Sequence, residues 1–198
     1  MGGRSGGSGT GMGSRSGGKQ RQLSKEANDL LTLVHTGAWK GLSYKDRDAI
    51  LEAVDKHADT LGETLDMYEK AGVLDALKAY QGSGYKYMNA AAMGKRTGDK
   101  KFDAEIKEHM KNLDRAIQMR KTTKEMIVWR GSSKAEKNSR RYVSVSLHAE
   151  VSASGFMSGK HLHAFRIPKG TPYAYSNRIG EYEMILPRGF KLQDYKIK

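Results

Sequence analysis

Hydrophobic spacing divides the chain into two parts. From residue 23 to about residue 120, apolar side chains recur at steps of three and four residues, the period of one face of an α-helix. The segment 101–119 keeps this spacing most strictly. Its apolar positions are Phe102, Ile106, Met110, Leu113 and Ile117. The pattern predicts a mostly helical part over residues 23–120, with its longest helix at 101–119.

Polar and glycine signals predict where shorter helices begin and where the chain turns. Ser24 and Ser43 each stand just before a run with helical spacing. A serine at this position caps a helix by accepting a hydrogen bond from a backbone N–H. Gly82-Ser83-Gly84 predicts a turn, followed by a helix that begins at Tyr85.

After residue 125 the spacing changes to a period of two, which is typical of half-buried strands. Predicted strands cover residues 126–129, 141–146, 161–167, 182–186 and 190–197. A short helix is expected within 148–157. Helices followed by strands predict an α+β domain over residues 23–198, with its strand-rich part at 121–198.

Composition separates the first 22 residues from the rest. Residues 1–20 hold 9 of the 23 Gly residues, together with four Ser, and this favours a disordered tail over residues 1–22. The chain of 198 residues has no Cys, which excludes disulfides and thiol catalysis. It has no apolar run of the roughly 18 residues that span a bilayer. We expect a protein without a secretory signal that acts in the cytoplasm.

The positive charge is unevenly distributed. The formal net charge is +13, and residues 121–198 hold 15 Lys and Arg against 6 Asp and Glu. This excess predicts that an anionic ligand or partner is attracted to the strand-rich part. It is also compatible with a basic nucleic-acid-binding module without catalysis, or with weak nucleic-acid contact through the tail.

Three separated signals in the strand-rich part carry candidate chemistry. Arg130-Gly131 ends an apolar strand, Ser144 and Ser146 face one side of another, and Glu181 and Glu183 are two positions apart. On a strand, residues two apart face the same side, so we expect the carboxylates to repel each other and one pKa to rise. The same Glu-x-Glu spacing is common on solvated edge strands.

The ordered set resembles the Arg–Ser–Glu class of mono-ADP-ribosyltransferases, which includes bacterial toxins and phage enzymes. The matching motifs are Arg130, Ser144-Val145-Ser146 and Glu181-Tyr182-Glu183, and the resemblance covers about residues 78–198. It extends to the flanks 165–175 and 180–189 and, more loosely, to 85–89. Val145 replaces the family's Thr or Ser, at a position that we expect to face away from the site. The implied fold is a mixed, mainly antiparallel two-sheet β core with an NAD cleft.

The resemblance also implies a role for each motif. NAD is the implied co-substrate, and no metal is implied. Arg130 would bind the NAD phosphates, Ser144 would hold Glu183 in place, and Glu183 would stabilise the ribosyl cation. Glu181 would orient and deprotonate an acceptor arginine. Further cofactor contacts are implied for Gly131, Ser146 and Phe156, the last by stacking on nicotinamide.

The resemblance implies a target protein with an accessible arginine and no membrane partner. Size and charge favour a phage-like enzyme in a bacterial cytoplasm, with host transcription or translation machinery among its targets. The alternatives are transfer to nucleic acid, or hydrolysis of NAD without transfer. His161 and His163 lie on one strand face and could be taken for a metal-binding pair. The sequence offers no nearby carboxylate or third ligand, so a metal site is not favoured.

Overall fold

The fold places helices before and around an antiparallel sheet. The computed structural model describes residues 21–62, 65–132, 140–154, 161–177 and 180–195. The helices are α1 (Lys25–Thr36), η1 (Ala38–Gly41), α2 (Tyr44–Asp55), α3 (Leu65–Lys70), α4 (Leu74–Ala79), η2 (Tyr80–Gly84), α5 (Tyr85–Ala92), α6 (Lys100–Gln118) and α7 (Ala149–Ser154). The strands are β1 (Met126–Ser132), β2 (Val143–Ser146), β3 (His161–Ile167), β4 (Ala174–Ser176), β5 (Glu183–Leu186) and β6 (Gln193–Asp194).

The helix ends follow local capping chemistry. The side chains of Ser24 and Ser43 accept hydrogen bonds from backbone N–H groups three residues on, which confirms both predicted helix starts. Asp99 caps α6 in the same way. The predicted helix 101–119 is confirmed as α6, which buries the stripe from Ile106 to Ile117. None of the helices in the described ranges is long and apolar enough to cross a membrane.

The α+β class is confirmed, but the described strands form one sheet rather than two. The strand order is β4-β5-β2-β1-β3-β6, and each neighbouring pair is antiparallel. Strands β1 and β2 are in register at a single pair, Trp129 with Ser146. The sheet therefore consists of two halves, β4-β5-β2 and β1-β3-β6, joined at one point.

Both halves bury side chains in one shared apolar cluster. Val143, Val145 and Met184 from one half pack in the same cluster as Val128 and Phe165 from the other. The two-sheet prediction followed from inward-facing apolar positions, and these do form a shared core. The sequence does not show the strand pairing that joins the two halves into one sheet. Val145 lies in this cluster, away from the face that carries Ser144, as predicted.

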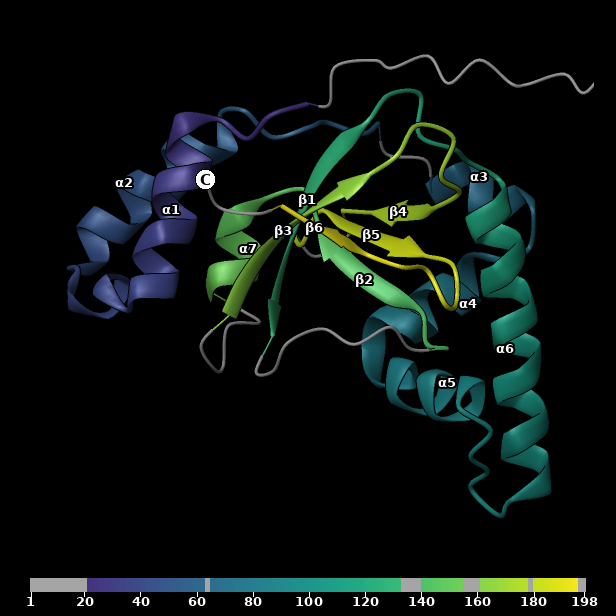
Figure 1. Cartoon of the computed structure of the whole chain (residues 1–198). Helices are drawn as coiled ribbons and strands as arrows, with labels where there is room; N and C mark the ends of the chain where they lie inside the picture. Colours follow the sequence, from purple (N-terminus) through teal and green to yellow (C-terminus); the bar gives the residue numbers. More distant parts are fainter. Residues whose placement is uncertain (1–20, 63–64, 133–139, 155–160, 178–179, 196–198) are drawn as a thin grey trace, which may run out of the picture.

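Helices cover the sheet on two sides, and Figure 1 shows α1 and α2 on one side of the sheet and α3 to α6 on the other. Leu30 and Leu51, from α1 and α2, pack with Trp129 of β1. On the other side, Tyr80 and Met88 pack with Ile185 of β5. The kink η2 and helix α5 are thereby set against the half of the sheet that contains β2 and β5.

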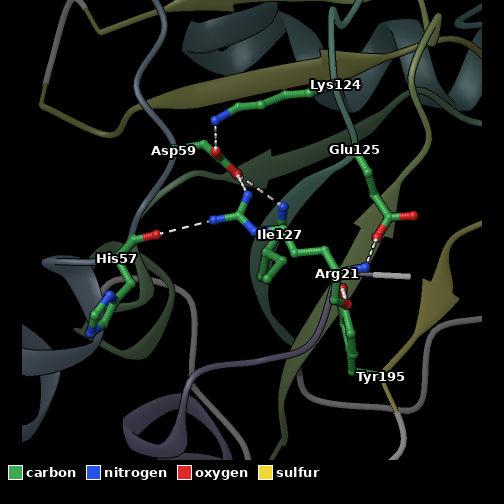
Figure 2. A network of polar contacts seen from close by, with 7 residues as sticks. All are labelled: Arg21, His57, Asp59, Lys124, Glu125, Ile127 and Tyr195. Atoms are coloured by element: carbon green, nitrogen blue, oxygen red, sulfur yellow. Dashed lines mark hydrogen bonds and ion pairs between the residues drawn. The ribbon is translucent and has the colours of Figure 1, made fainter. Parts of the chain in front are cut away.

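The start of the described chain is bound to the sheet by a polar network (Figure 2). Asp59 is 3% exposed and accepts hydrogen bonds from the Arg21 guanidinium and from the Ile127 backbone N–H. Lys124 Nζ lies 2.8 Å from the same carboxylate. Tyr195 donates to the Arg21 carbonyl oxygen at 2.7 Å. Arg21, which composition assigns to the tail, is thus part of the folded body; residues 1–20 lie outside the described residues.

The last predicted strand is shorter than the sequence pattern indicates. Of the described residues 190–195, only Gln193–Asp194 forms a strand, β6, which pairs with the Phe165–Arg166 segment of β3. Phe190 and Leu192 pack against the shared apolar cluster instead of continuing the ladder. Residues 196–198 lie outside the described residues.

Candidate active site

Ser144 lies at the centre of the candidate site. Alternation along β2 points Val143 and Val145 into the apolar cluster, so Ser144 faces the helices on the other side of the sheet. Its hydroxyl hydrogen bonds to the Glu183 carboxyl and shares a 3.3 Å hydrogen bond with the Tyr80 hydroxyl. Its carbonyl oxygen accepts a hydrogen bond from the Arg130 guanidinium. One strand residue therefore joins Arg130 to Glu183, two of the predicted site residues.

Glu183 begins β5 and is half-buried. It lies opposite Ser146 in the antiparallel register, beside the strand that carries Ser144. Gln81 Nε2 donates a hydrogen bond to Glu183 Oε2 at 3.0 Å. Burial raises the pKa of the Glu183 carboxyl above its ordinary value, and the hydrogen bonds from Ser144 and Gln81 oppose this rise. The site therefore keeps a carboxylate in surroundings that disfavour its charge.

Glu181 and Glu183 do not share a strand face as the sequence suggested. Glu181 precedes the strand, and Tyr182 between the two acids has φ of +47°. The chain makes a left-handed turn here, which is uncommon for a residue other than glycine. Burial is the main cause that raises the pKa of Glu183, and the negative charge of Glu181 raises it further. Partial burial raises the pKa of Glu181 as well.

Several contacts hold this turn. Ser146 Oγ donates to the Glu181 carbonyl oxygen at 2.8 Å, and the Leu147 N–H donates to the Tyr182 carbonyl oxygen at 3.1 Å. The Tyr182 ring stacks on the His148 ring, with centroids 3.8 Å apart and planes at 6°. Ser146, predicted as a cofactor contact, is 6% exposed and bonds to the turn. In the structure its hydroxyl positions Glu181.

The sequence did not point to Tyr80 and Gln81, which complete the site from the helical part. Gly82-Ser83-Gly84, predicted as a turn, belongs instead to the π-helical kink η2 that joins α4 to α5. Tyr80 receives a hydrogen bond from Asn89 Nδ2 at 3.4 Å, and burial raises the pKa of the Tyr80 hydroxyl. The only sequence signal for this feature is the glycine pair, because no periodic pattern marks a π-helical turn.

The remaining predicted positions are distributed as follows. Gly131 is buried in β1 opposite Leu162, one residue after Arg130. Phe156 lies outside the described residues. His163 Nδ1 lies 3.4 Å from the Asp194 carboxylate. Among the residues that the structure describes, no group of three or more His, Asp or Glu side chains is placed to hold a metal ion.

The guanidinium and the two carboxyl groups of the candidate site each suit a particular chemical role. A guanidinium binds an anionic group such as a phosphate through charge-assisted hydrogen bonds. A buried carboxylate beside it stabilises positive charge that develops on a reacting carbon. A second carboxylate with a raised pKa is suited to accept a proton. A site with these three groups suits the transfer of a sugar from a phosphorylated donor.

Comparison with known families agrees with this chemistry. The family model for the ADP-ribosyltransferase exoenzymes matches residues 55–139. The chain resembles the ADP-ribosyltransferase exoenzymes. This confirms the resemblance predicted from the motifs. The match contains Gln81 and Arg130 and ends before Ser144 and the two glutamates.

Solved structures of bacterial toxins are similar to this ADP-ribosyltransferase-like chain. The enzymatic component C2-I of the C2 toxin from Clostridium botulinum has 17% sequence identity and a TM-score of 0.51, over 69% of this chain and 41% of that chain. C3larvin, an ADP-ribosyltransferase from Paenibacillus larvae, has 23% identity and a TM-score of 0.44, over 63% and 79%. The ADP-ribosylating toxin BECa of C. perfringens, solved with NADH, has 18% identity and a TM-score of 0.48, over 59% and 36%.

The C2-I match shows that the chain shares the fold of that toxin component. The chain spans about a third of the length of BECa and two fifths of the length of C2-I. No curated protein matches the chain in sequence.

Proposed function

We propose that the chain transfers ADP-ribose from NAD to an arginine of a target protein and releases nicotinamide. The observation that carries this proposal is the double connection at Ser144, whose carbonyl oxygen accepts from Arg130 and whose hydroxyl bonds to Glu183. The guanidinium that we assign to phosphate binding and the carboxylate that we assign to cation stabilisation are thereby joined to the same residue. The matching family, named for ADP-ribosyltransferase activity, supports NAD as the co-substrate.

In the first part of the reaction, the bond between nicotinamide and C1′ of the ribose breaks. Nicotinamide leaves with the bonding electron pair, and positive charge develops on the ribose, as in glycoside hydrolysis. We assign Arg130 to the diphosphate and the Glu183 carboxylate to the developing cation. Gly131 and Phe156 are assigned to the nicotinamide end, by the same resemblance.

In the second part, a nitrogen of the acceptor guanidinium attacks C1′. A guanidinium is a weak nucleophile because it stays protonated, so it must lose a proton as the new C1′–N bond forms. We assign this proton to Glu181, because burial raises the pKa of its carboxyl and makes it a stronger base than a solvated glutamate. Ser146 and the His148–Tyr182 stack hold the turn that carries it.

The test is to incubate the purified chain with radiolabelled NAD and a bacterial lysate. We expect label on protein that is released by reagents that cleave arginine conjugates. Glu183→Gln is expected to lower both transfer and NAD hydrolysis by about 100-fold or more. Glu181→Gln is expected to lose transfer to arginine while NAD hydrolysis persists.

A matched control is Glu69→Gln, which changes an exposed carboxylate on α3 and should leave both activities unchanged. Equal loss of both activities in Glu181→Gln would contradict the division of roles. Label on nucleic acid would show transfer to nucleic acid instead of protein. Free ADP-ribose alone would show NAD hydrolysis without transfer. No turnover of NAD at all would refute the proposal.

A further inference from the structure

The two ends of the Gln81 carboxamide have different surroundings. Its Nε2 donates a hydrogen bond to Glu183 Oε2 at 3.0 Å. Its Oε1 is buried and accepts no hydrogen bond from any residue in the described part of the chain. A buried carbonyl oxygen without a donor is costly and rare in folded proteins. The amide nitrogen of Gln81 therefore has a hydrogen-bond acceptor in Glu183, whereas its oxygen lacks a donor among the described residues.

The backbone around Gln81 departs from a regular α-helix. Residues Tyr80–Gly84 form a π-helical turn, and Gly82 has non-helical angles of φ −91° and ψ −144°. A Cβ on Gly84 would lie 2.5 Å from the Ala79 carbonyl oxygen, so only glycine fits there. Turns of this kind are frequent at functional sites. The kink sets Gln81 against the sheet at the position where Glu183 begins β5.

We propose that Gln81 bridges Glu183 and the bound dinucleotide: Nε2 holds the carboxylate, and Oε1 accepts a hydrogen bond from a hydroxyl of the nicotinamide ribose. This inference rests on the proposed function, which brings that sugar to Glu183. The ribose carries two hydroxyl donors on neighbouring carbons. Glu183 and Gln81 offer two neighbouring acceptors, so each hydroxyl has one partner.

The hydrogen bond from Gln81 also acts on the charge of Glu183. The charged and titratable groups that face this carboxylate are Arg130 from β1, Glu181 from the turn and Tyr80 from η2. Burial and Glu181 favour its protonated form, whereas Arg130 and the hydrogen bonds from Ser144 and Gln81 favour the carboxylate. Removing the Gln81 donor should therefore raise the pKa of Glu183.

The first experiment measures this coupling without any activity assay. The chain is labelled with carboxyl-¹³C glutamate, and the Glu183 signal is assigned by its loss in Glu183→Gln. In Gln81→Met the titration midpoint of Glu183 should move to higher pH, and in Gln81→Glu it should move further because a second carboxylate replaces the donor. Ser83→Ala, an exposed change in the same kink, should leave the midpoint unchanged. An unchanged midpoint in Gln81→Met would overturn the inference.

The second experiment tests the ribose contact. NADH is used as the probe because its reduced ring is not a leaving group, and binding is followed by fluorescence. Gln81→Met should weaken NADH binding about three- to tenfold, the effect of one lost hydrogen bond. Two NADH analogues are compared, one without the 2′-hydroxyl and one without the 3′-hydroxyl of the nicotinamide ribose. The loss caused by Gln81→Met should disappear with one of them, the analogue that lacks the hydroxyl bound by Oε1. An equal loss with both deoxy analogues would show that Oε1 contacts neither hydroxyl.

The two experiments separate this inference from the proposed function. Failure of the unaltered chain to bind NADH would refute the proposed function and the ribose contact together, while the titration would still decide whether Gln81 controls Glu183. Normal NADH binding that Gln81→Met leaves unchanged would refute only the ribose contact. Thermal melting of each variant verifies that it is folded. Gln81→Asn keeps an amide on a side chain that is one methylene shorter, and it should behave as Gln81→Met does.

Discussion

The guanidinium of Arg130 is held in direction by its hydrogen bond to the Ser144 carbonyl oxygen. A planar guanidinium oriented in this way meets a phosphate at a defined angle, which a lysine ammonium does not reproduce. We therefore predict that Arg130→Lys weakens NADH binding by about tenfold or more, although the charge is kept. The measurement is a fluorescence titration with NADH.

The control for this change is Arg96→Lys, on the exposed segment between α5 and α6. It makes the same chemical change at an exposed position that has no part in the candidate site, and it should leave the affinity as it is. Equal affinities for the unaltered chain and Arg130→Lys would remove Arg130 from phosphate binding.

The half-buried charge of Glu183 has a consequence for stability. Burial raises the pKa of this carboxyl in the folded chain. Folding therefore favours the protonated form, and the stability that this provides is present below the unfolded pKa and is lost as the pH rises through the folded pKa. Glu183→Gln removes the charge and keeps the shape, so it should melt at a higher temperature than the unaltered chain at pH 8.

This difference in melting temperature should shrink as the pH falls toward about 4, where an unfolded glutamate becomes protonated. For a chain of this size, each kcal/mol relieved raises the melting temperature by about 2–4 °C. Calorimetry at several pH values is the measurement. A variant that melts lower than the unaltered chain at pH 8 would show that the charge stabilises the fold, contrary to this prediction.

Among the elements, the kink η2 depends on one glycine. A methyl group on Gly84 would meet the Ala79 backbone carbonyl oxygen at 2.5 Å, so the backbone would have to shift. Because Gln81 lies in the same turn, we predict that Gly84→Ala moves Gln81 from Glu183, destabilises the fold by about 1–3 kcal/mol and weakens NADH binding. Urea unfolding and NADH titration measure the two effects.

Gly41→Ala serves as the comparison, since a Cβ at Gly41 meets no atom within 4 Å. It should change neither quantity appreciably. If Gly84→Ala bound NADH as the unaltered chain does, the kink would have no part in the site.

Local pattern was sufficient for elements whose determinants are close in sequence. The stripe of α6, the serine caps of α1 and α2, and the alternation that sends Val145 and Ser144 to opposite faces of β2 were all predicted. The three motifs of the resemblance also pointed to Arg130, Ser144 and Glu183, which the structure brings together.

Features set by distant contacts could not be predicted in this way. The single register pair between Trp129 and Ser146 makes one sheet of two halves, and no local pattern encodes it. The chain between Glu181 and Glu183 makes a left-handed turn at Tyr182 instead of the strand alternation that the pattern predicts. Gln81 looks like an ordinary polar helix residue until the kink places it against β5.

For the whole molecule, the candidate site lies where the two halves of the sheet meet. Arg130 follows Trp129, whose pair with Ser146 joins β1 to β2, and its hydrogen bond to Ser144 crosses the same junction. Glu183 belongs to the β4-β5-β2 half and Arg130 to the other. The relative position of the two halves therefore sets the distance between the predicted phosphate-binding and cation-stabilising groups.

The network around Asp59 ties the chain's first described residue to the β1 half of the sheet (Figure 2). The Asp59 carboxylate is almost fully buried and binds Arg21, Lys124 and the Ile127 N–H. In Asp59→Ala the Ile127 N–H loses its acceptor and two cations lose their partner. We predict a loss of about 3 kcal/mol in the free energy of unfolding, measured in urea.

Solvent limits this loss, because the side chains of Arg21 and Lys124 are 34% and 65% exposed and regain water when the carboxylate is removed. The Ile127 N–H, in the ladder of β1, has no such compensation. Asp59→Asn keeps an acceptor for that N–H while losing the charge, so its loss should be clearly smaller. Equal losses in the two variants would mean that the ion pairs, rather than the backbone contact, hold the first described residues to the sheet.

The control is Asp75→Asn, which changes an exposed carboxylate on α4. Its free energy of unfolding should equal that of the unaltered chain.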